Sequence, residues 1–544
     1  MTYSEWIASY ATLTARDREA LAREVRMFIQ QPLISILIPI YNPDLEFLEA
    51  AIESVRRQQY PRWELCLADD HSNGDRVREF VEAISQEDLR CRYVLREKNG
   101  GIAACTNSAL ALASGEWCGL MDQDDLLAEN ALAEVASTIV YHPEAQLIYS
   151  DEDFVNVSGE RSNPFFKSDW NPELFLAQNY LNHLGIYRTS LMREIGGFRE
   201  GFEGSQDYDL ALRCVARLPA EQIRHIPKVL YHWRMTEGSL ALEPDAKPHA
   251  RHAARRALND YLARSRIAAT AEACSENNES HRVIYSLPAV RPKVSIFFGG
   301  EDEGVFLKGS DYPEIEIVRV ERGAEGANLA AQDASGEVLV FVSDKVCRAE
   351  DGWLSELVSH VLRPEVGVVG GCLSSSTGSV LDGGLILGLG GIAAPAFFGF
   401  PRGHPGYFNR ALLQQNLSAV SAGCLVVRQD VFKRLGGFDA ANLPYHFYDI
   451  DFCLRLRALQ LQVIWTPYAN LILSSDATDE ASFDDKETSY MQERWGGELR
   501  HDPFYNPNLS LEPPGFVLAT PPRLPAISKL AGGERTVTSD SSCD

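Results

Sequence analysis

Midway through its first half, the chain reads Trp117-Cys118-Gly119-Leu120-Met121-Asp122-Gln123-Asp124-Asp125, an apolar run that ends in a cluster of acids. The apolar part predicts a short buried strand. Carboxylates packed this densely at a strand end repel one another unless a cation holds them together. The spacing of Asp122 and Asp124 suits a hard divalent ion such as Mg²⁺ or Mn²⁺, which would also bind the phosphates of a substrate. The motif therefore predicts a metal site at the end of a strand.

The residues before this motif alternate between strand and helix patterns. Residues 34–40 predict a strand, residues 46–59 a helix, and residues 64–68 a second strand that ends in Asp69-Asp70. Strand, helix and strand with acids at the carboxyl end form a βαβ unit, and ligands usually bind at that end of the strands. Because the same alternation continues up to Asp122, we expect an α/β fold.

A damaged copy of the motif lies in the second half of the chain. Asn107 and residues 113–116 recur as Asn328 and residues 334–337, at the same spacing from the motif. In the copy, Ser343 and Lys345 stand in place of the two acids, and a lysine there would repel a cation. The stretch between Asp70 and Asn107 is also shortened in the copy to the few residues between Arg322 and Asn328, so a helix and a strand are expected to be missing. Further matches are Tyr60-Pro61 with Tyr312-Pro313, Gly196-Gly197-Phe198 with Gly436-Gly437-Phe438, and Asp207-Tyr208-Asp209 with Asp449-Ile450-Asp451.

Length and composition restrict the class of protein. A chain of 544 residues favours two or more domains, and 45% hydrophobic with 23% charged residues is ordinary for a globular protein. The net charge of −25 argues against nucleic acid as the main partner, because phosphate binding needs a basic surface. Eleven cysteines without a Cys-x-x-Cys pair favour reduced thiols in a cytosolic setting.

The first half resembles the family 2 glycosyltransferases, which have the GT-A fold. It is most similar to the subgroup that acts in O-antigen and other cell-surface polysaccharide assembly, often with a second GT-A-like unit. The residues that carry the resemblance are Pro39-x-Tyr41-Asn42, Asp69-Asp70, Asn99 with Gly101, Asn107, Gly115, Asp122-x-Asp124, Gly204-Ser205-Gln206-Asp207 and Tyr231-His232-Trp233-Arg234.

This resemblance implies a site for a nucleotide-diphosphate sugar. Asp69 and Asp70 would contact the base and ribose, although turn and helix-cap duty before Ser72 and Asn73 is an alternative. Arg234 could pair with phosphate oxygens, because a guanidinium matches them bidentately. The expected donor-binding residues are Pro39, Tyr41, Asn42, Asp69, Asp70, Asn99, Gly101, Asn107, Asp122 and Arg234.

The resemblance also implies a metal site and a catalytic base. Asp122 and Asp124 would hold a divalent cation, Mn²⁺ or Mg²⁺, with His232 as a third ligand; a satisfied histidine beside a core strand is the alternative for His232. Asp207 is the expected general base that takes the proton of the acceptor hydroxyl. Asp209 is expected to form only a surface pair with Arg213.

We therefore expect an α/β chain with a GT-A (Rossmann-like) nucleotide-sugar-binding domain followed by a second, truncated GT-A-like domain. The expected parts are an N-terminal helical segment (residues 1–31), the catalytic domain (32–266), a linker (267–292), the degenerate domain (293–515), which binds the acceptor or is structural, and a disordered tail (516–544).

The predicted function is that of a metal-dependent, inverting glycosyltransferase that extends a cell-surface glycan. The expected partners are a nucleotide-diphosphate sugar and a glycan or lipid-linked glycan acceptor, without nucleic acid. The expected location is cytoplasmic, with peripheral contact at the inner membrane through the basic helix at residues 246–266; a solvated helix face is the alternative. A non-catalytic glycan-binding scaffold built from two degenerate units is the alternative function.

Overall fold

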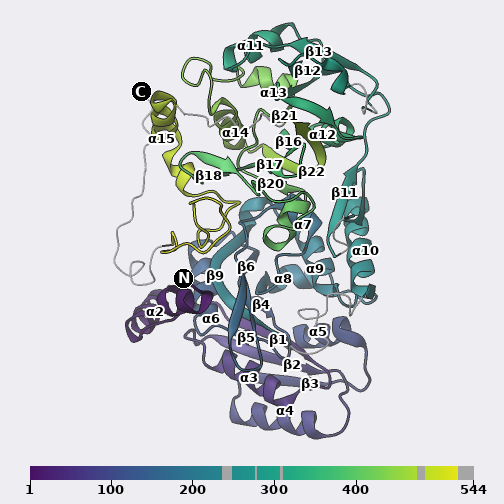
Figure 1. The fold of residues 1–544 in the computed structure, drawn as a ribbon. Coiled ribbons are helices and arrows are strands. Elements are labelled where there is room, and N and C mark those ends of the chain that lie inside the picture. Colours follow the sequence, from purple (N-terminus) through teal and green to yellow (C-terminus); the bar gives the residue numbers. More distant parts are fainter. Residues whose placement is uncertain (236–247, 276–278, 307–309, 311, 475–483, 525–544) are drawn as a thin grey trace.

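The computed structural model describes residues 1–235, 248–275, 279–306, 310, 312–474 and 484–524. These residues form two α/β lobes that stand one above the other in Figure 1. We call residues 34–264 the first lobe and residues 294–500 the second lobe. The chain passes between them through one hairpin beside α10.

The first lobe is built on a mixed nine-stranded sheet in the order β3-β2-β1-β4-β8-β6-β9-β5, with β7 paired to β6. The strands β1 to β4 are parallel, whereas β8 is antiparallel to both β4 and β6. The carboxyl ends of β1, β2 and β4 therefore meet at one edge of the sheet. The strands are β1 (Ile34–Ile40), β2 (Trp63–Asp69), β3 (Cys91–Leu95), β4 (Trp117–Leu120), β5 (Leu126–Leu127), β6 (Leu147–Val155), β7 (Arg161–Phe165), β8 (Gly185–Arg188) and β9 (Ile223–Arg234).

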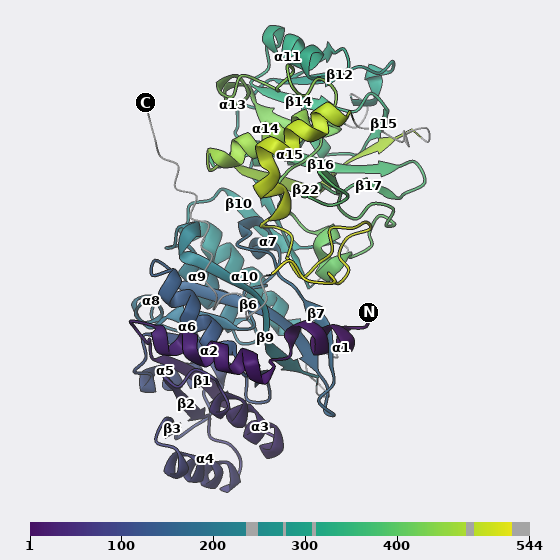
Figure 2. The same ribbon diagram turned by 90° about the vertical axis from the view of Figure 1, so that its left-hand side faces the viewer.

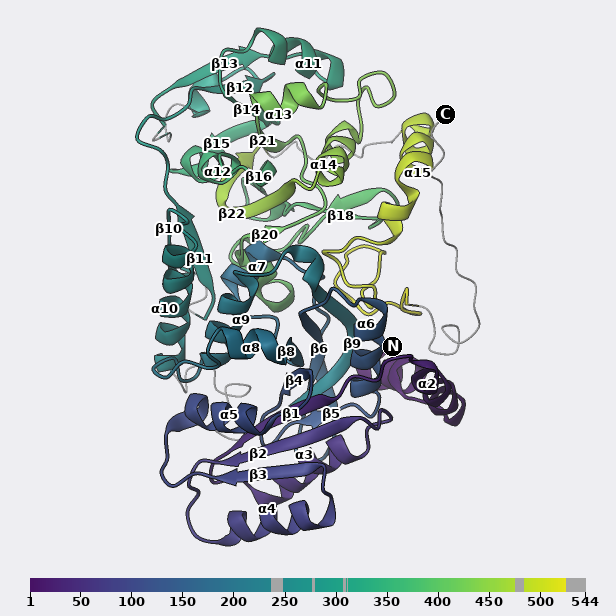
Figure 3. The same cartoon turned by 180° about the vertical axis from the view of Figure 1, so that it is seen from behind.

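Helices cover both faces of this sheet. Figure 3 shows α3 and α4 on one side of β1 to β3 and α5 on the other. Because side chains alternate along a strand, Leu37 joins the core beneath α5, while Ile36 and Ile38 join the core beneath α3. The helices are α3 (Leu45–Arg56), α4 (Arg76–Glu87), α5 (Gly101–Leu112), α6 (Ala131–Tyr141), α7 (Pro172–Ala177), α8 (Thr189–Glu194), α9 (Gln206–Val215) and α10 (Pro248–Arg264).

The second lobe repeats this sheet with one strand fewer at its edge. Its order is β13-β12-β14-β21-β16-β22-β15, which follows β2-β1-β4-β8-β6-β9-β5 of the first lobe strand by strand. Within the described residues, the chain runs directly from β13 to α11, so β3 and α4 have no counterpart and the predicted loss of a strand and a helix is confirmed. The elements are β12 (Val294–Phe298), β13 (Ile315–Arg319), β14 (Val338–Val342), β15 (Val346–Ala349), β16 (Val366–Ser375), β17 (Val380–Asp382), β18 (Leu385–Leu387), β19 (Ala393–Pro395), β20 (Gln415–Asn416), β21 (Cys424–Arg428), β22 (Gln462–Leu473), α11 (Ala324–Asp333), α12 (Trp353–Val361), α13 (Gln429–Arg434), α14 (Tyr448–Ala458) and α15 (Asp485–Arg500).

Both lobes use the same internal hydrogen bonds. The Asn107 side chain donates to the carbonyl of Phe198 (2.8 Å) and accepts from its N–H (2.8 Å). Asn328 brackets the backbone of Phe438 in the same way, at 2.8 and 2.9 Å. The glycine before each phenylalanine leaves room for the asparagine, since an added Cβ would lie within 2.4 Å of its side-chain oxygen. The matched residues of the two halves therefore include residues that hold the fold.

Two predicted boundaries are wrong. The expected linker contains the antiparallel hairpin of β10 (Ala269–Ala273) and β11 (His281–Tyr285), which contacts α7, α10 and α12. The expected disordered tail begins with packed residues, because Phe516 stacks on Phe397 at 5.0 Å and the carbonyl of Ala519 accepts from the indole of Trp6 at 2.9 Å. Apolar residues in both segments find partners on distant elements, which local composition does not show. Residues 525–544 lie outside the described residues.

The N-terminal helical segment docks onto the first lobe. It contains α1 (Tyr3–Trp6) and α2 (Ala15–Met27), which Figure 2 shows running along that lobe. Thr14 and Asp17 form a capping box at the start of α2. Arg18 on α2 makes two hydrogen bonds to Glu129, at 2.9 and 2.7 Å.

The shared asparagine contact yields a first prediction. Asn107→Ala and Asn328→Ala each leave a backbone N–H and a carbonyl without a partner, so each should lower the free energy of unfolding of its lobe by about 1–3 kcal/mol. Thermal unfolding followed lobe by lobe measures this loss. Equal stability of either variant and the wild type would contradict the structural role.

Candidate active site

The expected edge of the first sheet opens into a cavity of about 1090 Å³. Its wall is formed by the ends of β1 and β4, the start of α5, the first turn of α9, and residues of β6, α10 and the second lobe. Eight of the residues predicted to form the site line this cavity: Pro39, Tyr41, Asp70, Asn99, Gly101, Asp122, Asp124 and Asp207. The fold thus brings together residues from both ends of the first lobe.

The acidic motif occupies the turn after β4. Gln123 holds this turn against the end of β1, because its side chain accepts from the N–H of Tyr41 (2.9 Å) and donates to the Tyr41 carbonyl (3.3 Å). Asp122 and Asp124, on either side of Gln123, both line the cavity. This arrangement places two carboxylates beside a half-exposed tyrosine ring, which is 48% exposed.

A third acid of the motif, Asp125, lies beneath these two. Its carboxylate accepts from the N–H of Arg234 (2.7 Å) and from the hydroxyl of Tyr231. Burial, together with the negative charges of Asp122 and Asp124, raises the pKa of Asp125 well above its usual range. The close packing of these acids favours a bound cation, so Asp122 and Asp124 fit the predicted metal.

The structure does not support His232 as a third ligand. Its Nδ1 lies 2.6 Å from a carboxylate oxygen of Asp153, and Asp153 also accepts from Arg161 (2.6 Å) and from the Tyr3 hydroxyl (2.7 Å). On β9 the neighbouring Trp233 lines the cavity while His232 does not, as expected for alternating side chains. Among the described residues, no three His, Cys, Asp or Glu side chains are grouped closely enough to hold a metal ion. In this structure His232 therefore binds Asp153 and does not line the cavity with Asp122 and Asp124.

Arg234 also lies outside the cavity wall. Its guanidinium donates to the carbonyl of Asp124 (2.6 Å) and lies over the ring of Phe47, 4.6 Å from the centroid. Since its backbone N–H binds Asp125, Arg234 holds the acidic turn from behind. Its contact with a phosphate stays a prediction.

The two acids after β2 have different surroundings. Asp69 accepts from the N–H of Ser72 (3.2 Å), which is the turn duty named as the alternative. Asp70 lines the cavity, pairs with Arg96 (2.7 Å) and accepts from the N–H groups of Gly100 and Gly101. Asp70 therefore fixes the backbone at the start of α5, where Gly101 adopts a φ of +83° that favours glycine.

Two other predicted donor-binding residues make contacts within the protein. Asn42 accepts from the N–H of Asn73 (2.8 Å) and its own N–H donates to Ser72, so it ties the loop after β1 to the loop after β2. Asn107 uses its side chain to bracket the backbone of Phe198. The assignment of Asn107 to donor binding is wrong for this structure, because its amide is consumed by a structural contact.

Asp207 occupies the first turn of α9 and faces the cavity. Its carboxylate accepts from the side-chain amides of Asn179 (3.3 Å) and Asn182. Burial raises the pKa of Asp207 above its ordinary value. A carboxylate that binds protons more tightly is a better general base while it remains ionised near neutral pH.

Asp209 is buried and does not form the surface pair that its sequence predicts. It accepts from Arg213 (2.9 Å), as expected for residues four apart on a helix, but also from Arg199. Asp451 and Arg455 repeat the helical pair in the second lobe at 2.7 Å. Because the same pair recurs in the second lobe, where the acidic motif is lost, we assign Asp209 a structural role.

Two further residues line the cavity, Glu152 and His183, of which sequence reasoning missed His183. Burial alone would lower the pKa of His183, but the hydrogen bond to Glu152 and the charges of Glu152, Asp122 and Asp125 raise it to about 9. The site therefore contains a cationic ring next to the acidic turn. Glu152 had a signal in the sequence, the acidic run Asp151-Glu152-Asp153, whereas His183 stands in a loop without one.

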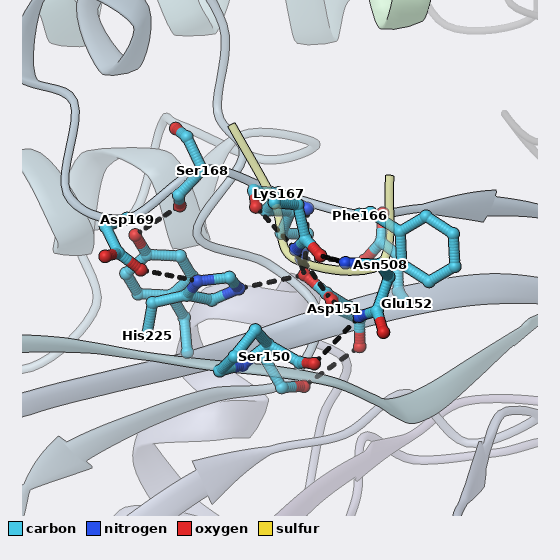
Figure 4. A network of polar contacts seen from close by, with 12 residues as sticks. Ser150, Asp151, Glu152, Phe166, Lys167, Ser168, Asp169, His225 and Asn508 are labelled. Atoms are coloured by element: carbon cyan, nitrogen blue, oxygen red, sulfur yellow. Dashed lines mark hydrogen bonds and ion pairs between the residues drawn. The ribbon is translucent and has the colours of Figure 1, made fainter. Parts of the chain in front are cut away.

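A buried polar network supports Glu152 from behind (Figure 4). The ammonium of Lys167 lies 3.3 Å from Glu152 and donates to the carbonyls of Asn182 and His183 at 2.7 and 2.9 Å. Next to Glu152 on β6, Asp151 accepts from His225 (2.8 Å).

The C-terminal segment enters the same network. Asp151 accepts from the side chain of Asn506 at 3.0 Å and from that of Asn508 at 3.4 Å. Asn506 also donates to the carbonyl of Lys167 (2.7 Å). The segment after the second lobe is thereby anchored next to the cavity wall.

With this geometry established, comparison with known proteins is informative. Residues 35–196 match glycosyl transferase family 2. The glycosyl transferase WcaA of Escherichia coli K12, which is named for colanic acid biosynthesis, is 30% identical over 36% of this chain and 73% of its own length. The chain belongs to glycosyl transferase family 2. The α/β architecture and the paired acids at the end of β4 agree with this assignment.

Two longer relatives match almost all of this family 2 chain. The O-antigen biosynthesis protein RfbC of Myxococcus xanthus is 32% identical over 94% of the chain and 42% of its own length. The uncharacterized protein y4gI of Sinorhizobium fredii is 38% identical over 96% of the chain and 62% of its own length. The chain thus spans less than two thirds of either relative. Among solved structures, S. aureus TarS 1-349 in complex with UDP gives a TM-score of 0.32 at 20% identity, over 43% of this chain and 71% of that one.

The network around Asp151 predicts a pH dependence of stability. Burial alone would lower the pKa of His225, but the charges of Asp151 and Asp169 raise it to about 9. A histidine whose pKa is raised on folding contributes stability that is fully present below its unfolded pKa of about 6.5 and is lost as the pH rises through about 9. Urea unfolding of the wild type should therefore show a falling free energy of unfolding between these pH values. His225→Gln, which does not titrate, should show a shallower fall, and identical slopes would contradict the assignment.

Proposed function

We propose that the chain is a metal-dependent, inverting glycosyltransferase that moves a sugar from a nucleotide-diphosphate donor to a hydroxyl of a growing cell-surface glycan. The observation that carries the proposal is the meeting of Asp122, Asp124 and Asp207 on one cavity wall. Paired acids beside a separate carboxylate of raised pKa suit a reaction in which a phosphate leaves and a hydroxyl loses its proton.

The residues of the cavity take distinct roles in this proposal. A divalent cation held by Asp122 and Asp124 would neutralise the charge that develops on the departing diphosphate. Asp207 accepts the proton of the acceptor hydroxyl as that oxygen attacks the sugar, in one displacement without a covalent intermediate. Tyr41, Asp70 and Asn99 line the part of the wall proposed for the nucleotide, and Asp70 presents the backbone of Gly101 to it.

The site of action is part of the proposal. In the residues that the structure describes, no helix is long and apolar enough to cross a membrane. We infer a cytoplasmic enzyme of bacterial envelope biosynthesis that meets the inner membrane through its acceptor. The basic helix α10 is a weak membrane contact in this view, because Arg251 pairs with Glu279 at 3.1 Å and Arg264 with Asp260 at 3.1 Å.

Metal-dependent nucleotide binding tests the donor site. Thermal unfolding with Mn²⁺ and each of UDP, dTDP, GDP and CMP should show a shift in one transition with one nucleotide, worth about 2.7 kcal/mol at a hundred times Kd. Asp124→Asn should abolish this shift because it removes one of the two proposed metal ligands. Asp344→Asn, which removes the acid between Ser343 and Lys345 in the copy, serves as the control and should leave the shift unchanged. A shift retained by Asp124→Asn would refute the metal assignment.

Replacement of the proposed base separates chemistry from binding. Asp207→Asn should slow transfer by about 10²–10⁴-fold, the usual effect of a positioned base, while the nucleotide shift persists. Since burial raises the pKa of Asp207, ionisation of this carboxyl costs stability near neutral pH, and the variant should unfold no more easily than the wild type. Loss of the nucleotide shift in Asp207→Asn would remove Asp207 from the base role. Inactivity of the wild type with every donor would favour a glycan-binding scaffold.

A further inference from the structure

A second cavity of about 730 Å³ lies beside the candidate active site. It forms where α1, β7, the turn at residues 407–412 and the C-terminal segment meet, and Figure 2 shows α1, β7 and that segment side by side. Its described lining contains no charged side chain. Six aromatic rings dominate its wall: Tyr3, Phe154, Phe166, Tyr407, Phe408 and Phe516.

Contacts outside the cavity hold these rings in place. The hydroxyl of Tyr407 donates to the carbonyl of Pro164 (2.8 Å) and accepts from the N–H of Phe166 (2.9 Å), so the second lobe is fastened to β7. Phe408 stacks on Phe165 with a centroid distance of 4.0 Å. The aromatic wall is therefore preformed, which lowers the entropic cost of binding a ligand.

The turn that carries Phe408 has an unusual backbone. Phe408 and Asn409 adopt φ values of +46° and +66°, in the left-handed region that most residues avoid. Such conformations persist only where surrounding contacts determine them, and they cluster at ligand-binding sites. The turn projects from the second lobe into the wall of the first-lobe cavity, which both of its residues line.

The two cavities adjoin. Phe154 and Phe408 line both of them, and Trp233 of the first cavity stacks on Phe154 at 5.4 Å. The residues proposed to hold the nucleotide, Tyr41 and Asp70, line only the first cavity. A molecule that extends from Asp207 past Phe408 would therefore enter the second cavity.

We propose that this second cavity is an acceptor subsite that binds uncharged sugar units next to the one that receives the transferred sugar; this rests on the proposed function. The lack of charged side chains in the lining disfavours a nucleotide or a phosphate, which a cationic side chain usually pairs with. Aromatic faces pack against the apolar faces of sugar rings, while Asn163 and Thr520 offer hydrogen bonds to hydroxyl groups. The second lobe thereby acquires a role in placing the acceptor.

Glycan binding tests the subsite without any need for turnover. The probe is a printed array of bacterial oligosaccharides, incubated with the fluorescently labelled full chain, and the affinity for each retained glycan is then measured by titration. Phe408→Ala should weaken binding about tenfold, the scale expected for a lost ring contact together with its buried surface. Phe408→Leu, which keeps apolar bulk without an aromatic face, should weaken it similarly, whereas Phe408→Trp should retain it.

A matched control comes from the same lobe. Phe398 is 58% exposed and lines neither cavity, so Phe398→Ala should bind glycans like the wild type. Full affinity in both Phe408→Ala and Phe408→Leu, or no retained glycan with the wild type, would overturn the subsite. Preference for a decyl glycoside over every oligosaccharide would overturn it in favour of a lipid site.

The nucleotide shift separates this proposal from the proposed function. All Phe408 variants should keep the metal-dependent thermal shift of the wild type, because Phe408 is not among the residues proposed to contact the nucleotide or the metal. If the wild type shows the nucleotide-dependent thermal shift but glycan binding does not depend on Phe408, the subsite is refuted and the proposed transferase function stands. Phe408-dependent glycan binding without any nucleotide shift would refute the transferase and leave the subsite.

Discussion

Repulsion among carboxylates at the end of β4 is the constraint around which the first lobe is arranged. Three aspartates stand within four residues there, and Asp125 is buried under the other two. The C-terminal end of β9 packs against the turn, and two hydrogen bonds stabilise the carboxylate of Asp125 there. They come from the hydroxyl of Tyr231 and the backbone N–H of Arg234. Asp122 and Asp124 line the cavity, and theirs is the charge that the proposed metal ion would neutralise.

The internal repeat separates the residues that form the fold from those that form the site. Asn107 and its match Asn328 bracket the same backbone position, and the buried pair of Asp209 with Arg213 recurs as Asp451 with Arg455. These contacts are present in the second lobe, where Asp122 and Asp124 have no acidic counterparts. Similarity between the two halves is thus evidence of shared architecture, while the positions at which they differ indicate the chemistry. The same comparison removes Asn107 from the donor site.

The second lobe, which has Ser343 and Lys345 in place of the paired acids, contributes residues to the cavity wall of the first lobe. The turn at residues 407–412 and the C-terminal segment both reach the first lobe, the former through Tyr407 and Phe408 and the latter through Asn506. These contacts place aromatic rings and a buried amide network next to Glu152 on the cavity wall. A lobe without an acidic motif can still shape the site of its neighbour, because the two share one continuous wall.

The sequence by itself determined the alternation of strands and helices, the position of β1, the missing strand and helix of the copy, and the acids that close β4. These follow from apolar periodicity and charge spacing, which act over a few residues. Only the tertiary structure decided that His232 faces Asp153 and that Arg234 lies behind the acidic turn, because the direction of a side chain depends on strand pairing across the sheet. It also decided that Glu152, His183 and Phe408 share the cavity with Asp207, since they come from elements far apart in the chain and no local pattern records their contact.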